Sequence, residues 1–92
     1  SSPEALKIFR DEPHGFDLVI TDMTMPQMTG LKLSRAIHDT RPGIPIILST
    51  GYDIAITEVE AKENGIRELV RKPFRFNEFS VLIRHVLDRP SP

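Results

Sequence analysis

The chain has 92 residues, a formal net charge of -1 at pH 7 and no cysteine. This length predicts one domain, and the nearly even charge balance does not suggest a surface for nucleic acid or anionic membranes. The lack of cysteine excludes disulfides, a thiolate zinc site and a thiol nucleophile. No apolar run reaches membrane-spanning length and no leader opens the chain, so the sequence predicts a soluble, cytoplasmic protein without direct contact to nucleic acid or membrane.

Helical and strand-like segments alternate along the chain. The first helix is expected to start at Ser2 and Pro3 and to end at the Pro13 turn. Further helices are predicted at residues 30–39, about 54–63 and 74–87. Short apolar runs at residues 16–20, 44–48 and 66–70 predict buried strands. This order predicts an α/β fold with a parallel sheet of three strands that helices cover on both faces.

One polar residue stands at the carboxyl end of each predicted strand: Asp22, Thr50 and Lys72. Because the carboxyl ends of parallel strands lie at one edge of a sheet, we expect these three side chains to converge. An attacking carboxylate, a hydroxyl donor and a positive charge are what a phosphoryl group needs. Gly51 would let a backbone N–H approach such a ligand closely.

Simpler interpretations compete with a site. An aspartate after a strand is often only a turn residue, and a lone threonine or lysine there is more often structural, but all three together favour a site. The methionines are interpreted as packing residues rather than soft-metal ligands (Met23, Met25 and Met28). The histidines are interpreted as solvated surface residues (His14, His38 and His85). The phenylalanines between residues 74 and 79 are interpreted as core.

Three ordered motifs resemble a known family: DLVITDMTMPQMTG at 17–30, IPIILSTGY at 44–52 and ELVRKPF at 68–74. From residue 2 to about 88 the sequence resembles the receiver domain of two-component response regulators, particularly the hybrid-kinase type. The resemblance implies a flavodoxin-like (CheY-like), doubly wound parallel sheet, with residues 1–92 forming one receiver domain.

The resemblance also implies a function in a phosphorelay. Asp22 would accept a phosphoryl group from the phosphohistidine of a sensor histidine kinase or a histidine phosphotransfer domain. Thr50 would hydrogen-bond the acyl phosphate, and Lys72 would pair with it. Phosphorylation would then switch the surface formed by residues 52–88. Such a module phosphorylates and dephosphorylates itself and is not an enzyme with a separate substrate.

Mg²⁺ is the cofactor that the resemblance implies. Asp22 and the backbone carbonyl of Thr24 would bind the ion, while Thr24 and Gly51 would also contact the phosphate. Thr24 and Tyr52 match the positions that tune phosphate lifetime in the family. The bond between Lys72 and Pro73 would be cis, an isomer that is accessible before proline.

Two features depart from the family pattern. Receivers begin with a strand that ends in an acidic pair, then a helix and a second strand. No counterpart of that segment occurs in these 92 residues, so the resemblance implies a receiver domain truncated at its amino end. Mg²⁺ binding is therefore expected to be weak, and the strand that ends at Asp22 is expected to be an open edge that favours self-association. Leu69 stands where the family often has tyrosine or phenylalanine, so no aromatic ring can report the switch.

Two other functions stay open at this stage. A degenerate interaction domain that is not phosphorylated fits the missing acidic pair. A fragment of a haloacid-dehalogenase-type phosphatase would also use a strand-end aspartate, a threonine and a lysine. That enzyme class needs a second aspartate two residues after the nucleophile as general acid, and Thr24 occupies this position. The sequence does not name the partner kinase, the regulated process or the output domain.

Overall fold

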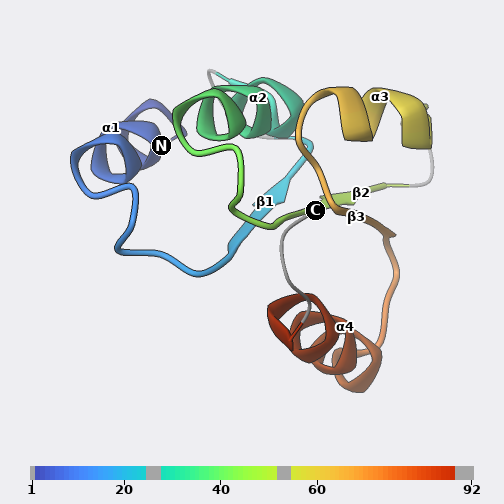
Figure 1. The fold of residues 1–92 in the computed structure, drawn as a ribbon. Helices are drawn as coiled ribbons and strands as arrows, with labels where there is room; N and C mark the ends of the chain where they lie inside the picture. Colours follow the sequence, from blue (N-terminus) through green and yellow to red (C-terminus); the bar gives the residue numbers. More distant parts are fainter. Residues whose placement is uncertain (1, 25–27, 52–54, 89–92) are drawn as a thin grey trace.

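The computed structural model describes residues 2–24, 28–51 and 55–88, in which helices and strands alternate (Figure 1). The helices are Ser2–Asp11 (α1), Gly30–Thr40 (α2), Glu58–Glu63 (α3) and Phe76–Asp88 (α4). The strands are Val19–Asp22 (β1), Ile46–Thr50 (β2) and Glu68–Arg71 (β3). None of the described helices is long and apolar enough to cross a membrane.

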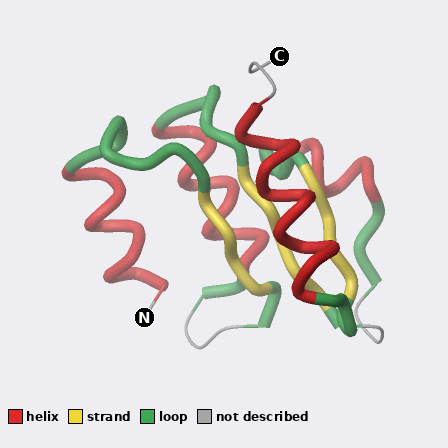
Figure 2. Tube along the Cα trace, turned by 90° about the horizontal axis from the view of Figure 1, so that it is seen from below, coloured by secondary structure: helices red, strands yellow, loops and turns green. Residues whose placement is uncertain are grey.

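The described strands form one parallel sheet in the order β1-β2-β3. Asp22 lies opposite Ser49 across the first pair, and Thr50 lies opposite Arg71 across the second. Helices α1, α2 and α3 cover one face of the sheet, while α4 lies on the other face (Figures 1 and 2). The predicted α/β fold, with three strands and four helices, is therefore confirmed.

The core forms around the central strand. Ile46, Ile47 and Leu48 are completely buried, because β2 has a neighbouring strand on each side and helices over both faces. Each such side chain contributes about 1.5–3 kcal/mol relative to an exposed one. Apolar residues of α1 and α2 complete the core on one face (Leu6, Phe9, Leu33 and Ile37). Met23 and Met28 pack against this cluster as predicted, and Met25 lies outside the described residues.

Several predicted boundaries are wrong. β2 is Ile46–Thr50 rather than 44–48, and β3 starts at Glu68 rather than at residue 66. The first strand starts at Val19 rather than residue 16, because the Arg41 guanidinium binds the carbonyls of Pro13 and Phe16 at 2.9 and 2.5 Å and holds that segment as a turn. The third helix starts at Glu58, after a capping box in which Thr57 and Glu60 bond each other's backbone N–H groups. The signal for this later start, threonine followed three residues on by glutamate, was present in the sequence.

Two predicted environments also need correction. His14 and His85 are exposed as expected, whereas His38 is half-buried, with its Nδ1 atom shielded from solvent. A Cβ at Gly65, which has a φ of 81°, would overlap the His38 side chain, so the helix end and this turn are in close contact. Two phenylalanines of the predicted core stripe are not part of the core: Phe74 is 39% exposed and Phe76 is 87% exposed. The side of α4 that carries the buried Val86 is the side that faces the sheet.

Candidate functional site

The described structure brings Asp22 and Lys72 together, although fifty residues separate them in the sequence. Asp22 is the last residue of β1, and Lys72 follows the last residue of β3, two strands away. The Lys72 ammonium donates to a carboxylate oxygen of Asp22 at 2.5 Å. The peptide bond between Lys72 and Pro73 is cis, as predicted.

Backbone hydrogen bonds hold this edge of the sheet together. The N–H of Met23 donates to the carbonyl of Ser49, and the N–H of Lys72 donates to the carbonyl of Thr50, both at 2.8 Å. The N–H of Thr24 donates to the second carboxylate oxygen of Asp22 at 3.2 Å. The Asp22 carboxylate therefore has a defined orientation, with one oxygen on an ammonium and the other on a backbone amide.

Thr50 is the last residue of β2 and is completely buried. Its hydroxyl oxygen has no hydrogen-bond partner among the described residues. A buried hydroxyl without a partner is costly, and in native proteins it often indicates a functional role. Gly51 follows directly and is half-buried, while Thr24 is exposed next to Asp22. Tyr52 lies outside the described residues.

Gly30 is a residue of this site that the sequence reasoning did not single out. Its N–H donates to the carbonyl of Met23 at 3.0 Å, which closes the loop between β1 and α2. A Cβ at Gly30 would overlap the backbone carbonyl oxygen of Asp22 and would lie 2.7 Å from a methyl group of Leu48. The available signal was a glycine at the end of the turn that follows the Asp22 strand.

The electrostatics of the site favour a charged Asp22. The hydrogen bond from Lys72 is the largest influence that lowers the pKa of the carboxyl below its ordinary value of 3.8, and the N–H of Thr24 adds to it. Burial acts in the opposite direction and is the weaker effect. A carboxyl with a lowered pKa is ionised at neutral pH, which is the state that a nucleophilic oxygen or a cation ligand requires.

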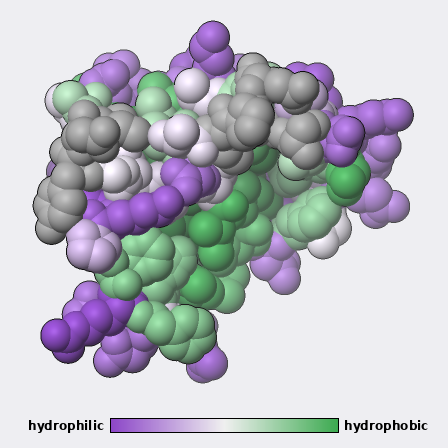
Figure 3. All heavy atoms as spheres, turned by 180° about the vertical axis from the view of Figure 1, so that it is seen from behind, coloured by the Kyte–Doolittle hydropathy of each residue, from purple (hydrophilic) through white to green (hydrophobic). Residues whose placement is uncertain are grey.

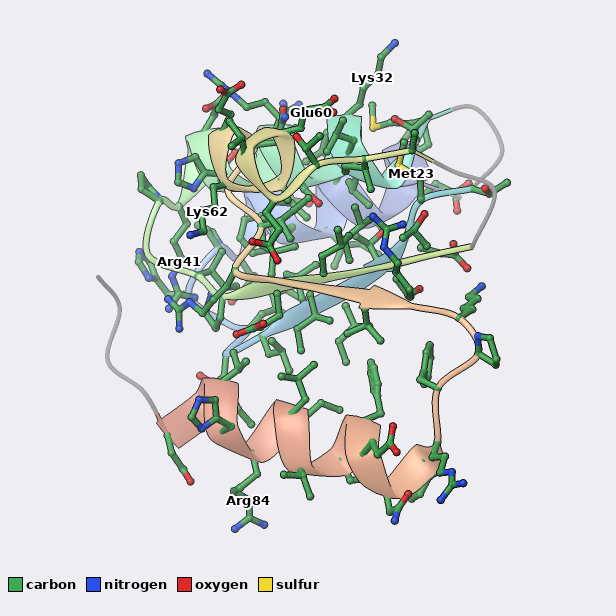
Figure 4. All side chains as sticks on the ribbon, turned by 90° about the vertical axis from the view of Figure 1, so that its right-hand side faces the viewer. Met23, Lys32, Arg41, Glu60, Lys62 and Arg84 are labelled. Carbon is green, nitrogen blue, oxygen red and sulfur yellow. The ribbon has the colours of Figure 1, made fainter. Side chains whose placement is uncertain are left out.

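Replacing Lys72 with methionine is expected to raise the pKa of Asp22 toward 3.8. Because the folded-state pKa is lowered, the contribution of Asp22 to stability is present above the unfolded-state pKa and is lost as pH falls through the folded-state pKa. This effect is small, since the two side chains are 49% and 38% exposed and solvent screens the pair. NMR titration of the Asp22 carboxyl carbon measures the shift. The control is Lys32→Met, which removes a lysine that points away from the sheet (Figure 4). If the titration of Asp22 were unchanged in Lys72→Met, Lys72 would not be the cause of the lowered pKa.

The donor set for a metal ion is incomplete in the described part of the chain. Asp22 supplies one carboxylate, and no group of three or more histidine, cysteine or acidic side chains that could hold a metal ion occurs among the described residues. Mg²⁺ is a hard cation that prefers several oxygen ligands, usually including one or two carboxylates or a phosphate. The described residues therefore fit Mg²⁺ only in part.

Comparison with known proteins identifies the family. The family model for the response regulator receiver domain matches residues 1–84. The chain is 37% identical to the DNA-binding transcriptional regulator NtrC of Azospirillum brasilense over 83% of its length, and 35% identical to the two-component response regulator-like protein APRR3 of Arabidopsis thaliana over 94%. It spans only 16% and 18% of those two proteins.

Solved structures show the same similarity. A response regulator receiver domain protein from Clostridium thermocellum matches with a TM-score of 0.86 and 34% identity, over 97% of this chain and 71% of the other. The non-phosphorylated HemR receiver domain from Leptospira biflexa matches with a TM-score of 0.85 and 27% identity, over 100% of this chain and 73% of the HemR chain. Receiver domains are phosphoacceptor signalling modules that interact with phosphodonor kinases and typically bind Mg²⁺ at the phosphorylation site. The chain belongs to the family of response regulator receiver domains.

Proposed function

We propose that Asp22 is the phosphoacceptor of this receiver domain. The observation that carries the proposal is the ionised carboxylate of Asp22 at the sheet edge, paired with Lys72. A carboxylate oxygen of Asp22 attacks the phosphorus atom of a donor phosphohistidine and forms an acyl phosphate. The P–N bond breaks, and its electron pair stays on the imidazole nitrogen of the donor, which takes up a proton from solvent.

The neighbouring groups of the site support this transfer. The Lys72 ammonium neutralises charge on the transferred group, and the N–H of Thr24 adds a hydrogen-bond donor on the other side of the carboxylate. The buried hydroxyl of Thr50 supplies a donor that has no hydrogen-bond partner in the described part of the resting protein. Gly51, directly after Thr50, offers a backbone N–H without a side chain in the way.

The proposed partner is a sensor histidine kinase or a histidine phosphotransfer domain. Residues 1–92 act as one receiver domain in this proposal, and no separate substrate is turned over. Phosphorylation switches the surface of α3, β3 and α4, which corresponds to the described part of residues 52–88. The hybrid-kinase type remains a prediction from the motifs. Mg²⁺ binding in this chain is weak, because Asp22 is the one carboxylate that the described site supplies.

Incubation with acetyl phosphate and Mg²⁺, followed by intact-mass measurement, tests the proposed function. The expected result is a gain of one phosphoryl group, which peptide mapping locates at Asp22. The gain is expected to require a high Mg²⁺ concentration. If the chain gains no mass while a known receiver domain treated in parallel does, the proposal is overturned, and the alternative of an interaction domain without phosphorylation takes its place. The family match does not favour the phosphatase alternative.

Replacing Thr50 with valine is expected to act in opposite directions on the resting and phosphorylated states. In the resting protein the change removes a buried hydroxyl that has no hydrogen-bond partner among the residues that the structure describes, and it raises the free energy of unfolding by about 1 kcal/mol. In the phosphorylated protein it removes a donor to a charged group and reduces phosphoryl occupancy roughly tenfold. Urea denaturation and intact mass measure the two effects. Thr40→Val, at an exposed position on α2, is the control; equal phosphoryl occupancy in both variants would rule out the role of Thr50.

In addition to the contact with a phosphodonor, we propose that the chain self-associates through β1. β1 is an edge of the described sheet, and Ile20 on this strand is 48% exposed. Figure 3 shows apolar residues gathered on the face of the molecule that is seen from behind. For the unchanged chain, light scattering is expected to show a molecular mass that rises with protein concentration. The Ile20→Lys variant is expected to be a monomer, because a lysine on an edge strand opposes pairing. Ile8→Lys, at an exposed position of α1, is the control. A monomer at high concentration for the unchanged chain contradicts the proposal.

A further inference from the structure

We propose that Arg71 couples the state of the Asp22–Lys72 pair to helix α3, which makes Arg71 a positioning residue in the response to phosphorylation. This inference rests on the function proposed above. One contact between the end of β3 and the segment before α3 carries it: the Nη2 atom of Arg71 donates a hydrogen bond to the backbone carbonyl of Ile56 at 2.9 Å.

At one end of this contact, Arg71 lies beside the phosphorylation site without contacting Asp22 in any hydrogen bond described above. It directly precedes Lys72, and it is the register partner of Thr50 on the neighbouring strand. The backbone N–H of Lys72 donates to the carbonyl of Thr50 at 2.8 Å, so the ends of β2 and β3 are joined where the site lies. A movement of Lys72 toward a new phosphoryl group on Asp22 therefore displaces the backbone that carries Arg71.

At the other end, the contact holds the start of α3. The Ile56 side chain is buried in the core, and the next residue, Thr57, is the cap of the helix. The Thr57 hydroxyl accepts from the N–H of Glu60 at 3.1 Å, and the Glu60 carboxylate accepts from the N–H of Thr57 at 3.3 Å. α3 has six residues, and so short a helix depends on tertiary contacts for its stability. A displaced Ile56 carbonyl therefore changes the stability of the first turn of α3.

The side chains of β3 explain why Arg71, and not another residue of this strand, connects the Asp22–Lys72 pair to α3. Leu69 and Arg71 lie on the same face of β3, because successive side chains of a strand alternate between faces. Leu69 packs against the core with an aliphatic side chain that cannot form a hydrogen bond. On this face of β3, Arg71 is the residue with a charged donor long enough to reach the segment before α3.

Hydrogen exchange of the α3 amides tests the coupling in the full chain, with and without acetyl phosphate, while intact mass reports phosphorylation in the same samples. In the unchanged chain, phosphorylation is expected to alter the exchange of the Glu60 and Ala61 amides. Arg71→Gln is expected to gain the phosphoryl group but to lose this response, and its α3 amides exchange roughly tenfold faster at rest, because a charged hydrogen bond is lost. Arg84→Gln removes the same charge from α4, where Arg84 points away from the sheet (Figure 4), and is expected to respond like the unchanged chain.

The outcomes separate this inference from the proposed function. No phosphoryl gain in the unchanged chain overturns the proposed function, and the inference with it. A phosphorylated Arg71→Gln variant that keeps the normal α3 response overturns the inference alone. If Arg71→Gln does not fold cooperatively, the side-chain NMR signal of Arg71 in the unchanged chain decides instead. Coupling requires that this signal and the Glu60 amide signal change together during phosphorylation, and an unchanged Arg71 signal overturns it.

Discussion

Replacement of Asp22 with asparagine is expected to abolish phosphoryl incorporation from acetyl phosphate. The amide of asparagine carries no negative charge, and its nitrogen lone pair is delocalised, so the side chain cannot attack phosphorus. The change also removes the charged partner of Lys72. Because this pair is partly exposed, we expect the free energy of unfolding to change by less than about 1 kcal/mol. Intact mass and urea denaturation of the same preparation measure both quantities.

Asp17→Asn is the matched control for Asp22→Asn. Asp17 is an exposed aspartate close to the start of the same strand, and β1 begins only two residues later. This variant is expected to gain one phosphoryl group to the same extent as the unchanged chain. Continued phosphoryl incorporation in Asp22→Asn, or its loss in Asp17→Asn, would show that Asp22 is not the acceptor.

Replacement of Gly30 with alanine is expected to produce the largest loss of stability, about 3 kcal/mol in the free energy of unfolding. The new Cβ would overlap the backbone carbonyl oxygen of Asp22 and would lie 2.7 Å from a methyl group of Leu48, which is itself completely buried. The backbone of β1 cannot move away without loss of its pairing with β2. Alanine favours a helix over glycine by about 1 kcal/mol, which offsets only part of this cost.

Urea denaturation followed by circular dichroism measures the effect of Gly30→Ala as a lower midpoint with an unchanged slope. The same shift moves the end of β1, so phosphoryl incorporation at Asp22 is also expected to slow. Gly15→Ala is the control, because a Cβ in that exposed turn meets its nearest atom, the Glu12 carbonyl oxygen, at 3.3 Å. We expect a change of about 1 kcal/mol or less for this control. Equal stabilities of the two variants would contradict the tight approach at Gly30.

The fold class and the strand-end residues could be predicted from the sequence, because both depend on local patterns. Alternating apolar runs and helical stripes indicate a parallel α/β sheet, and parallel strands bring their carboxyl ends to one edge. Asp22, Thr50 and Lys72 could therefore be selected although they are far apart in the chain. The boundaries of β1 and α3 were predicted wrongly, because Arg41 and the Thr57 capping box override the apolar periodicity at those places.

Other features depend on contacts that no local pattern encodes. The close approach of Gly30 to the Asp22 carbonyl, the half-buried position of His38 and the exposure of Phe76 follow from how neighbouring elements pack. The contact between Arg71 and Ile56 joins residues 15 positions apart and forms only when β3 and the start of α3 lie side by side.

The sequence by itself determined the α/β fold, the order of its elements and the residue types at the strand ends, because hydrophobic period and turn residues act locally. Only the tertiary structure decided that the Asp22 carboxylate pairs with Lys72 and that Arg71 donates to the Ile56 carbonyl. It also decided that the Thr50 hydroxyl is buried with no partner in the described ranges of the chain. The physical reason is distance: these interactions join strands and loops that are far apart in the chain, and side-chain direction and burial arise only once the sheet and its helices have packed.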